Sequence, residues 1–92
     1  MSEENLSGNL GVQIGTVSSF FRKPSVAAFL LENKNIEVGD VIYIKGHTTD
    51  FKMQIISMQI EGNDIKKAVI GQDLGMKVDE KCRVGDKIYF IK

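Results

Sequence analysis

The sequence contains few of the residue types on which cross-links and many reaction centres depend. Its 92 residues include no tryptophan and only one cysteine, one histidine and one proline. A single cysteine excludes an intramolecular disulfide and a structural zinc site made of cysteines, and a lone histidine is a poor metal site. Because neither residue has a catalytic partner beside it in the sequence, we expect Cys82 to be an inert, half-buried thiol and His47 a loop residue.

The sequence also lacks net charge and long apolar runs. Twelve Lys and Arg residues balance twelve Asp and Glu residues, which argues against a surface that attracts phosphate everywhere but permits a local basic patch. No apolar run is long enough to span a bilayer, and the acidic start MSEENLSGNLG lacks the basic and apolar regions of a secretory signal. We therefore expect a soluble cytoplasmic protein that makes no contact with a membrane.

Short apolar runs separated by Gly, Asn and Asp make up most of the sequence, and this pattern is typical of strands and turns. The expected strands are Gly11–Phe21, Val26–Leu31, Val41–Gly46, Phe51–Ile60, Ile65–Val78 and Lys87–Ile91. A helix beginning at Ser25 is the alternative for the second of these, since Ala, Leu and Glu favour it, although the apolar spacing stops at Leu31. We expect residues 1–10 to be a flexible lead and residues 11–92 to form a single small all-β domain, a barrel or a sandwich.

Three local features predict bends within the expected strands or a turn between them. Gly15 lies inside the first strand and predicts a bulge or a sharp bend. Ile55 and Ile56 are both apolar, so the fourth strand must switch the face that it buries, which a bulge would explain. The EGND stretch, Glu61–Asp64, has the composition of a hairpin turn.

The stretch VGDVIYI at Val38–Ile44 is nearly repeated as VGDKIYF at Val84–Phe90. In each copy the glycine can adopt a positive φ, and the aspartate that follows can accept backbone N–H bonds in a tight turn. We therefore interpret both aspartates as turn residues rather than as a carboxylate pair or a metal site. The structural turn residues are Gly39, Asp40, Gly85 and Asp86. Alternation after each turn predicts that Ile42, Ile44, Ile88 and Phe90 point inward and that Tyr43 and Tyr89 point outward.

Several motifs follow one another in a familiar order between Gly11 and the C-terminus: GTV, IEVGDVIYIKG, ISMQI, AVIGQDLGMKV and RVGDKIY. This order resembles the second domain of translation elongation factors of the elongation factor Tu superfamily, and a similar barrel forms the C-terminal part of some U32-type peptidases. The resemblance implies a closed six-stranded Greek-key barrel of the translation-protein type, with contact to RNA or a ribonucleoprotein. The sequence has no GxxxxGK[ST] phosphate loop and no length for a GTPase domain, so GTP binding is not expected.

Basic residues form the first candidate interaction surface. Arg22 and Lys23 directly follow two phenylalanines, and aromatic side chains among basic ones suit base stacking and phosphate contact. The predicted RNA-binding residues are Arg22, Lys23, Lys66, Lys67, Lys77, Lys81, Arg83 and Lys87. Asp79, Glu80 and Asp86 lie among them and would weaken their field, so an ordinary solvated charged surface is the alternative.

The second expected strand supplies the other candidate surface, because it is apolar on both faces. If its alternate residues Ala27, Phe29 and Leu31 point inward, the residues between them form an apolar outer face that another element or a partner must cover. The predicted protein-docking residues are Val26, Ala28 and Leu30.

No group of residues has the pattern of a reaction centre. The serines lie outside GxSxG and SxxK motifs, and the GQDLG stretch at Gly71–Gly75 lacks the lysine of a phosphate-binding loop. We therefore expect a non-enzymatic binding module with no catalytic residues, no cofactor and no metal. The expected partner is RNA or a ribonucleoprotein. The alternative partner is a protein, either an enzyme on which the barrel acts in trans or a second copy of this chain.

Overall fold

The computed structural model describes residues 11–92, so the flexible lead expected at residues 1–10 lies outside the described residues. The strands are β1 (Val12–Phe21), β2 (Val26–Leu30), β3 (Ile36–Glu37), β4 (Val41–Lys45), β5 (Asp50–Gln54), β6 (Met58–Ile60), β7 (Asn63–Ile65), β8 (Lys67–Ala68), β9 (Asp73–Lys77) and β10 (Lys87–Phe90). Residues 11–92 contain no helix, so the predicted all-β class is confirmed and the alternative helix after Ser25 is wrong. None of these residues belongs to a helix that could cross a membrane.

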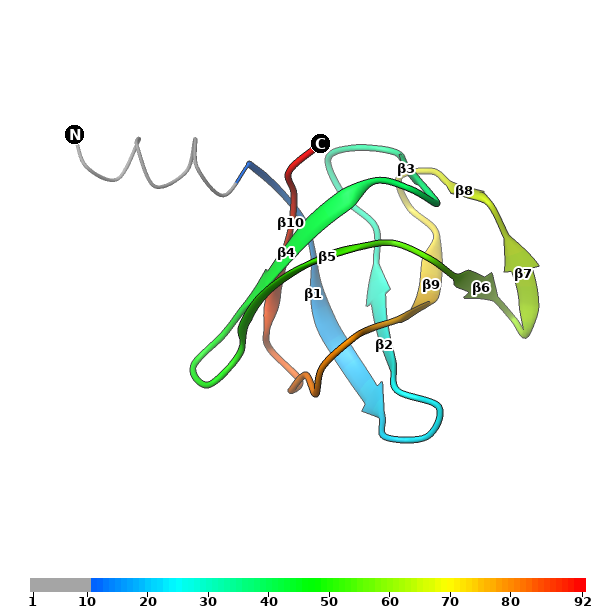
Figure 1. The fold of residues 1–92 in the computed structure, drawn as a ribbon. Coiled ribbons are helices and arrows are strands. Elements are labelled where there is room, and N and C mark those ends of the chain that lie inside the picture. The colour runs from blue at the N-terminus through cyan, green and yellow to red at the C-terminus, as the bar shows by residue number, and fades with distance from the viewer. Residues whose placement is uncertain (1–10) are drawn as a thin grey trace.

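Eight of the strands form one antiparallel sheet in the order β5–β4–β10–β1–β2–β9–β6–β7, while β3 and β8 pair with each other in a separate small sheet. Figure 1 shows that the large sheet curls, with β4 and β5 passing in front of β1 and β2. The predicted closed six-stranded Greek-key barrel is therefore wrong. Within residues 11–92 the strands β5 and β7 remain the two ends of a curled sheet, and no strand pairing joins them.

The reason for this difference lies in two predicted strands that break. The predicted strand Phe51–Ile60 divides into β5 and β6, which occupy distant places in the sheet. Residues 55–57 belong to no strand, so the face switch is a break in the strand and not a bulge; Ile55 is buried there and Ile56 is 58% exposed. Ile55 N donates to Asp40 O at 2.8 Å, which fixes the break beside the first VGD turn. The predicted strand Ile65–Val78 likewise divides into the end of β7, β8 and β9.

Strand β1 allows the sheet to curl because it bends between its two partners. Its first half pairs with β10 and its second half with β2, and the register shifts at Gln13–Gly15 and again at Val17–Ser19. Such bulges bend a strand and increase its twist. A Cβ atom at Gly15 would overlap the ring of Phe29, so the close approach of β1 and β2 at this point requires glycine. The interruption expected at Gly15 is thus present.

The core lies inside the curl and contains inward-pointing side chains of nearly every strand. The largest fully buried side chains are Phe29, Ile14, Leu31, Ile42, Ile44, Ile55, Met58, Met76, Ile88, Val17 and Cys82. Each buried Ile, Leu or Phe stabilises the fold by about 1.5–3 kcal/mol relative to an exposed one. The inward residues expected after the VGD turns lie here, although Phe90 is only partly buried at the edge of the core.

Candidate functional site

The two VGD turns have the same geometry and are structural. Asp40 Oδ2 accepts the backbone N–H of Glu37 at 2.9 Å, and Asp86 Oδ2 accepts that of Arg83 at 2.8 Å. The glycine before each aspartate has a φ of 105° or 99°, a region that favours glycine. Each aspartate therefore closes the turn that leads into β4 or β10. The two carboxylates belong to separate turns and make separate backbone bonds.

One part of the predicted RNA-binding set gathers around the turn between β1 and β2. Arg22 and Lys23 lie in this turn, and Lys77 Nζ donates to the carbonyl of Pro24 at 3.1 Å. A shallow hollow beside the turn is lined by Arg22 and Lys81, and also by two acidic residues. Acidic groups thus stand next to the cations here, as the charged-surface alternative expects.

The remaining predicted basic residues lie elsewhere. Lys66 and Lys67 flank the start of β8, which Figure 1 places away from the turn between β1 and β2. Lys67 Nζ lies 4.0 Å from a carboxylate oxygen of Glu37. Arg83 belongs to the second VGD turn and Lys87 to β10. Lys66 and Lys67 therefore lie apart from the predicted basic residues around the turn between β1 and β2.

The outer face of β2, predicted to dock a protein, is a narrow apolar strip. Val26 and Ala28 are half-buried, and Leu30 is 51% exposed. Phe21 of β1 lies opposite Val26 and is 54% exposed, so the apolar strip extends from β2 onto the neighbouring strand β1. On the other side, β9 places charged residues opposite both ends of β2.

Cys82 and His47 occupy positions that offer no reactive centre. Burial, with smaller contributions from the nearby carboxylates of Asp86 and Glu80, raises the pKa of the Cys82 thiol to about 12. The thiol is therefore protonated at neutral pH and is a poor nucleophile. His47 is exposed in the turn between β4 and β5. Across residues 11–92, no three His, Cys, Asp or Glu side chains are grouped so that they could hold a metal ion.

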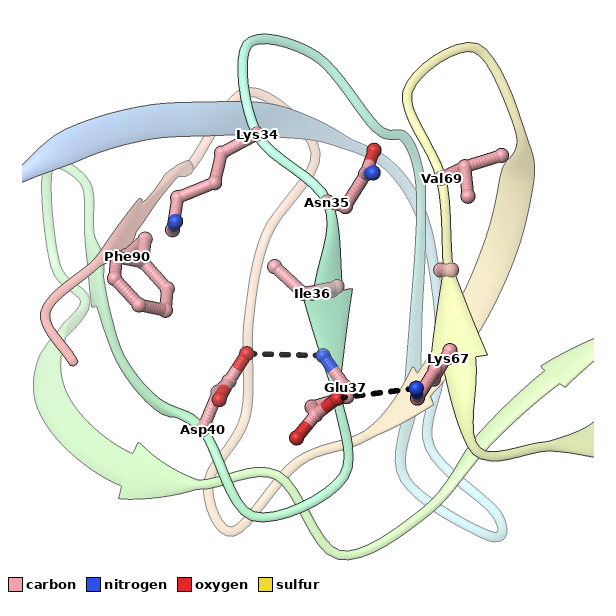
Figure 2. A pocket seen from close by; sticks show the side chains of 9 residues that line it. Lys34, Asn35, Ile36, Glu37, Asp40, Lys67, Val69 and Phe90 are labelled. Atoms are coloured by element: carbon pink, nitrogen blue, oxygen red, sulfur yellow. Dashed lines mark hydrogen bonds and ion pairs between the residues drawn. The ribbon is translucent and has the colours of Figure 1, made fainter.

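A groove of about 380 Å³ lies between the small β3–β8 sheet and the end of β10, and Figure 2 shows it from close by. Its floor is apolar, because Ile36 and Ala68 are buried and the ring of Phe90 is partly buried beside them. Lys34 Nζ lies 4.5 Å from the centroid of the Phe90 ring, within the range of a cation–π contact. The contact places a positive charge over one end of the groove.

Charged groups of both signs form the rim of this groove. Glu37 and Lys67 line the groove as direct neighbours on the paired strands β3 and β8, and their side chains are 56% and 79% exposed. An exposed ion pair of this kind contributes about 0–1 kcal/mol, so either partner can be exchanged for a charged group of a ligand at little cost. Asp40 adds a second carboxylate, and Asn35 Oδ1 accepts the backbone N–H of Ile70 at 2.9 Å.

Sequence reasoning missed the groove because its residues come from three separate segments. The stretch 34–40, the stretch 67–69 and Phe90 meet only when β3 pairs with β8 beside the end of β10. One signal was available, since Asp40 and Phe90 each belong to a VGD repeat. In the sequence the repeat predicts only two turns, but the two copies also bring Asp40 and Phe90 to the same groove.

Comparison with curated proteins finds proteases, while no family model matches the chain. The chain is 36% identical over 91 residues to an uncharacterized protease of Methanocaldococcus jannaschii, an alignment that covers 98% of this chain and 22% of that protein. It is 33% identical over 79 residues to a collagenase of Porphyromonas gingivalis, covering 85% of this chain and 19% of the collagenase. The chain thus spans about a fifth of the length of the curated relatives that it matches.

Comparison with solved structures decides the fold. A crystal structure of the C-terminal domain of a Geobacillus thermoleovorans U32 peptidase matches with a TM-score of 0.77 at 20% identity, covering 84% of this chain and 96% of that domain. This chain has the fold of a U32 peptidase C-terminal domain. A second crystal structure of that domain gives a TM-score of 0.76. The U32-type part of the predicted resemblance is therefore supported at the level of fold, whereas these matches show no link to the elongation factors.

Proposed function

We propose that this chain is a non-catalytic docking domain that binds the catalytic part of a U32-type peptidase. The observation that carries the proposal is the alignment with the M. jannaschii protease, which covers 98% of this chain but 22% of that protein. Nearly all of this domain therefore has a counterpart in a protein that also contains a much longer part. A docking domain for that longer part needs no reaction centre of its own.

The groove of Figure 2 is the surface that we assign to this contact. Protein interfaces have an apolar centre surrounded by a polar rim, and the groove has this arrangement, with Ile36, Ala68 and Phe90 below and charges of both signs above. Its volume of about 380 Å³ can accept a large side chain of a partner. The strip on β2 is the weaker candidate, because charged residues of β9 stand opposite its ends.

The proposal is tested with the M. jannaschii relative after removal of its segment that aligns with this chain. We expect this chain to bind the remaining part in isothermal titration calorimetry with a Kd below about 100 µM. Lys67→Glu and Lys34→Glu each reverse a charge on the groove and should weaken binding about tenfold or more, since like charges across an interface are costly. Lys23→Glu makes the same change in the turn between β1 and β2 and should leave binding unchanged.

The excised segment of the relative is the positive control for the same titration. If that segment binds and this chain does not, docking of this chain on a U32-type peptidase is contradicted. Equal weakening by Lys23→Glu and Lys67→Glu would instead show that the contact lies outside the groove.

A further inference from the structure

The outer face of β5, β4 and β10 carries aromatic and basic side chains that docking through the groove does not use. Tyr43 in β4 lies directly opposite Tyr89 in β10, and Lys52 of β5 lies opposite Tyr43 on its other side. Two residues further along the same face, Lys45 lies opposite Lys87. We call these five residues, Tyr43, Tyr89, Lys45, Lys52 and Lys87, the tyrosine–lysine platform.

The charge of the platform is unbalanced in its own region. Lysines placed directly opposite each other on adjacent strands destabilise a sheet, and Lys45 and Lys87 have this arrangement. In the part of the chain that the structure describes, Asp50 is the one carboxylate that strand pairing places opposite these residues, and it forms an ion pair with Lys45 at 3.1 Å. Within residues 11–92, neither Lys52 nor Lys87 has an acidic partner for its ammonium group. Three lysines against one aspartate leave an excess of positive charge, although the whole chain has none.

One tyrosine of the platform is held in place by a hydrogen bond, and both tyrosines remain accessible. The Tyr43 hydroxyl donates a hydrogen bond to Asp50, so the carboxylate that pairs with Lys45 also fixes this ring. Both tyrosines are half-buried, which leaves part of each ring open to solvent. Two rings on adjacent strands of a sheet, with ammonium groups on the same face, can bind a chain of planar groups linked by anions. The planar groups stack on the rings, and the anions contact the ammonium groups.

We propose that the tyrosine–lysine platform binds single-stranded nucleic acid. Unstacked bases can stack on Tyr43 and Tyr89, because every base has a π-face, and the ammonium groups beside the rings neutralise the phosphates. The bases of a duplex are already stacked on one another, so they are not available to stack on the tyrosine rings. Of the basic residues that the sequence suggested for RNA contact, only Lys87 belongs to this face. An acidic polypeptide would also meet the lysines, but it would gain nothing specific from the paired rings.

The test measures fluorescence anisotropy of labelled 12-nucleotide single strands of RNA and of DNA, at low salt, with the duplex of the same sequence as the third arm. Non-specific single-strand binding predicts a Kd of about 1–100 µM for at least one of the single strands. Tyr89→Leu should weaken it about 5- to 150-fold, the range for loss of one stacked base. Tyr89→Phe keeps the ring and should stay within about twofold of the original protein, because stacking needs the ring and not the hydroxyl.

A matched pair of lysine variants tests the phosphate contact. Lys87→Gln should reduce the slope of log K against log salt by about 0.7, the value for one phosphate contact on a single strand. Lys23→Gln removes the same charge from the turn between β1 and β2 and should leave the slope unchanged. The proposal is overturned if no single strand binds at about 100 µM protein, if the duplex binds as tightly, or if Tyr89→Leu matches Tyr89→Phe. The groove variant Lys67→Glu should bind the single strand as before, so failure of docking and failure of this proposal are distinguishable.

Discussion

At the scale of single residues, two aspartates make the same backbone bond in different surroundings. Asp86 is 3% exposed and packs so closely against Gly46 that a Cβ atom there would overlap its carboxylate. Asp40 is half-buried and lies on the groove. Loss of a buried hydrogen-bonding group leaves its partner unsatisfied and creates a void, whereas loss of a solvated one allows water to take its place.

This difference predicts unequal costs for the same substitution. Asp86→Ala should lower the free energy of unfolding by about 1–3 kcal/mol, and Asp40→Ala by about 1 kcal/mol or less. Urea unfolding of the two variants beside the original protein measures both values. An equal cost, or a larger cost for Asp40→Ala, would contradict the assignment of Asp86 as the more buried turn residue.

Cys82 predicts a pH dependence of stability. Its pKa in the folded state is raised to about 12, mainly by burial. Because the unfolded thiol ionises at a lower pH than the folded one, its stabilising contribution is complete below the unfolded pKa and is lost as the pH rises towards 12. The free energy of unfolding, measured by urea at successive pH values above 8.5, should therefore fall more steeply for the original protein than for Cys82→Ala. Parallel curves would show that Cys82 does not titrate differently on folding.

At the scale of elements, β1 depends on the absence of a side chain at one point. A Cβ atom at Gly15 would overlap the Phe29 ring and lie 3.0 Å from the Leu30 carbonyl oxygen. At Gly75 in β9, by contrast, a Cβ atom would meet only a methyl group of Val26, at 3.0 Å, and a side chain can move more easily than the backbone. The two glycines therefore differ in what surrounds them.

We expect Gly15→Ala to lower the free energy of unfolding by about 1–3 kcal/mol, the usual cost of an overpacked core. Gly75→Ala should change it by less than about 1 kcal/mol, since alanine reduces the entropy of the unfolded chain and the neighbouring valine can adjust. Thermal unfolding followed by circular dichroism gives both shifts. Similar melting temperatures for the two variants would argue that β1 can bend without glycine at this position.

At the scale of the whole molecule, the sequence correctly predicted which side chains point into the core, because this depends only on alternation along each strand. Ile42, Ile44 and Ile88 point inward as expected, because side chains on a strand alternate between its two faces whatever lies beside the strand. The sequence predicts a bulge at Ile55–Ile56 where the structure has a break, because only the neighbours of β5 and β6 show that these strands separate. The prediction of a closed barrel was wrong for the same reason, since it also depends on which strands are neighbours.

Both candidate binding surfaces were beyond sequence reasoning because they depend on strand neighbours. Tyr43 and Tyr89 were expected to point outward, but nothing in the sequence shows that β4 pairs with β10 in the register that sets them opposite each other. The predicted basic set combines residues of several separate segments, and the fold places Lys66 and Lys67 at the start of β8, away from the turn between β1 and β2 (Figure 1). The alternation of apolar residues thus predicted which face of a strand each side chain points to, but not which side chains of other strands lie beside it.

The open ends of the curled sheet have a consequence for association between copies of this chain. A sheet that does not close leaves strand edges whose backbone groups can pair with another molecule. Proteins resist such pairing with short edge strands and with charges, and this chain has both. The edge strand β7 has only three residues, and β5 carries Asp50 and Lys52 on its outer side. Growth of an intermolecular sheet is therefore disfavoured at each edge, and we do not expect two copies of this chain to associate by pairing their edge strands.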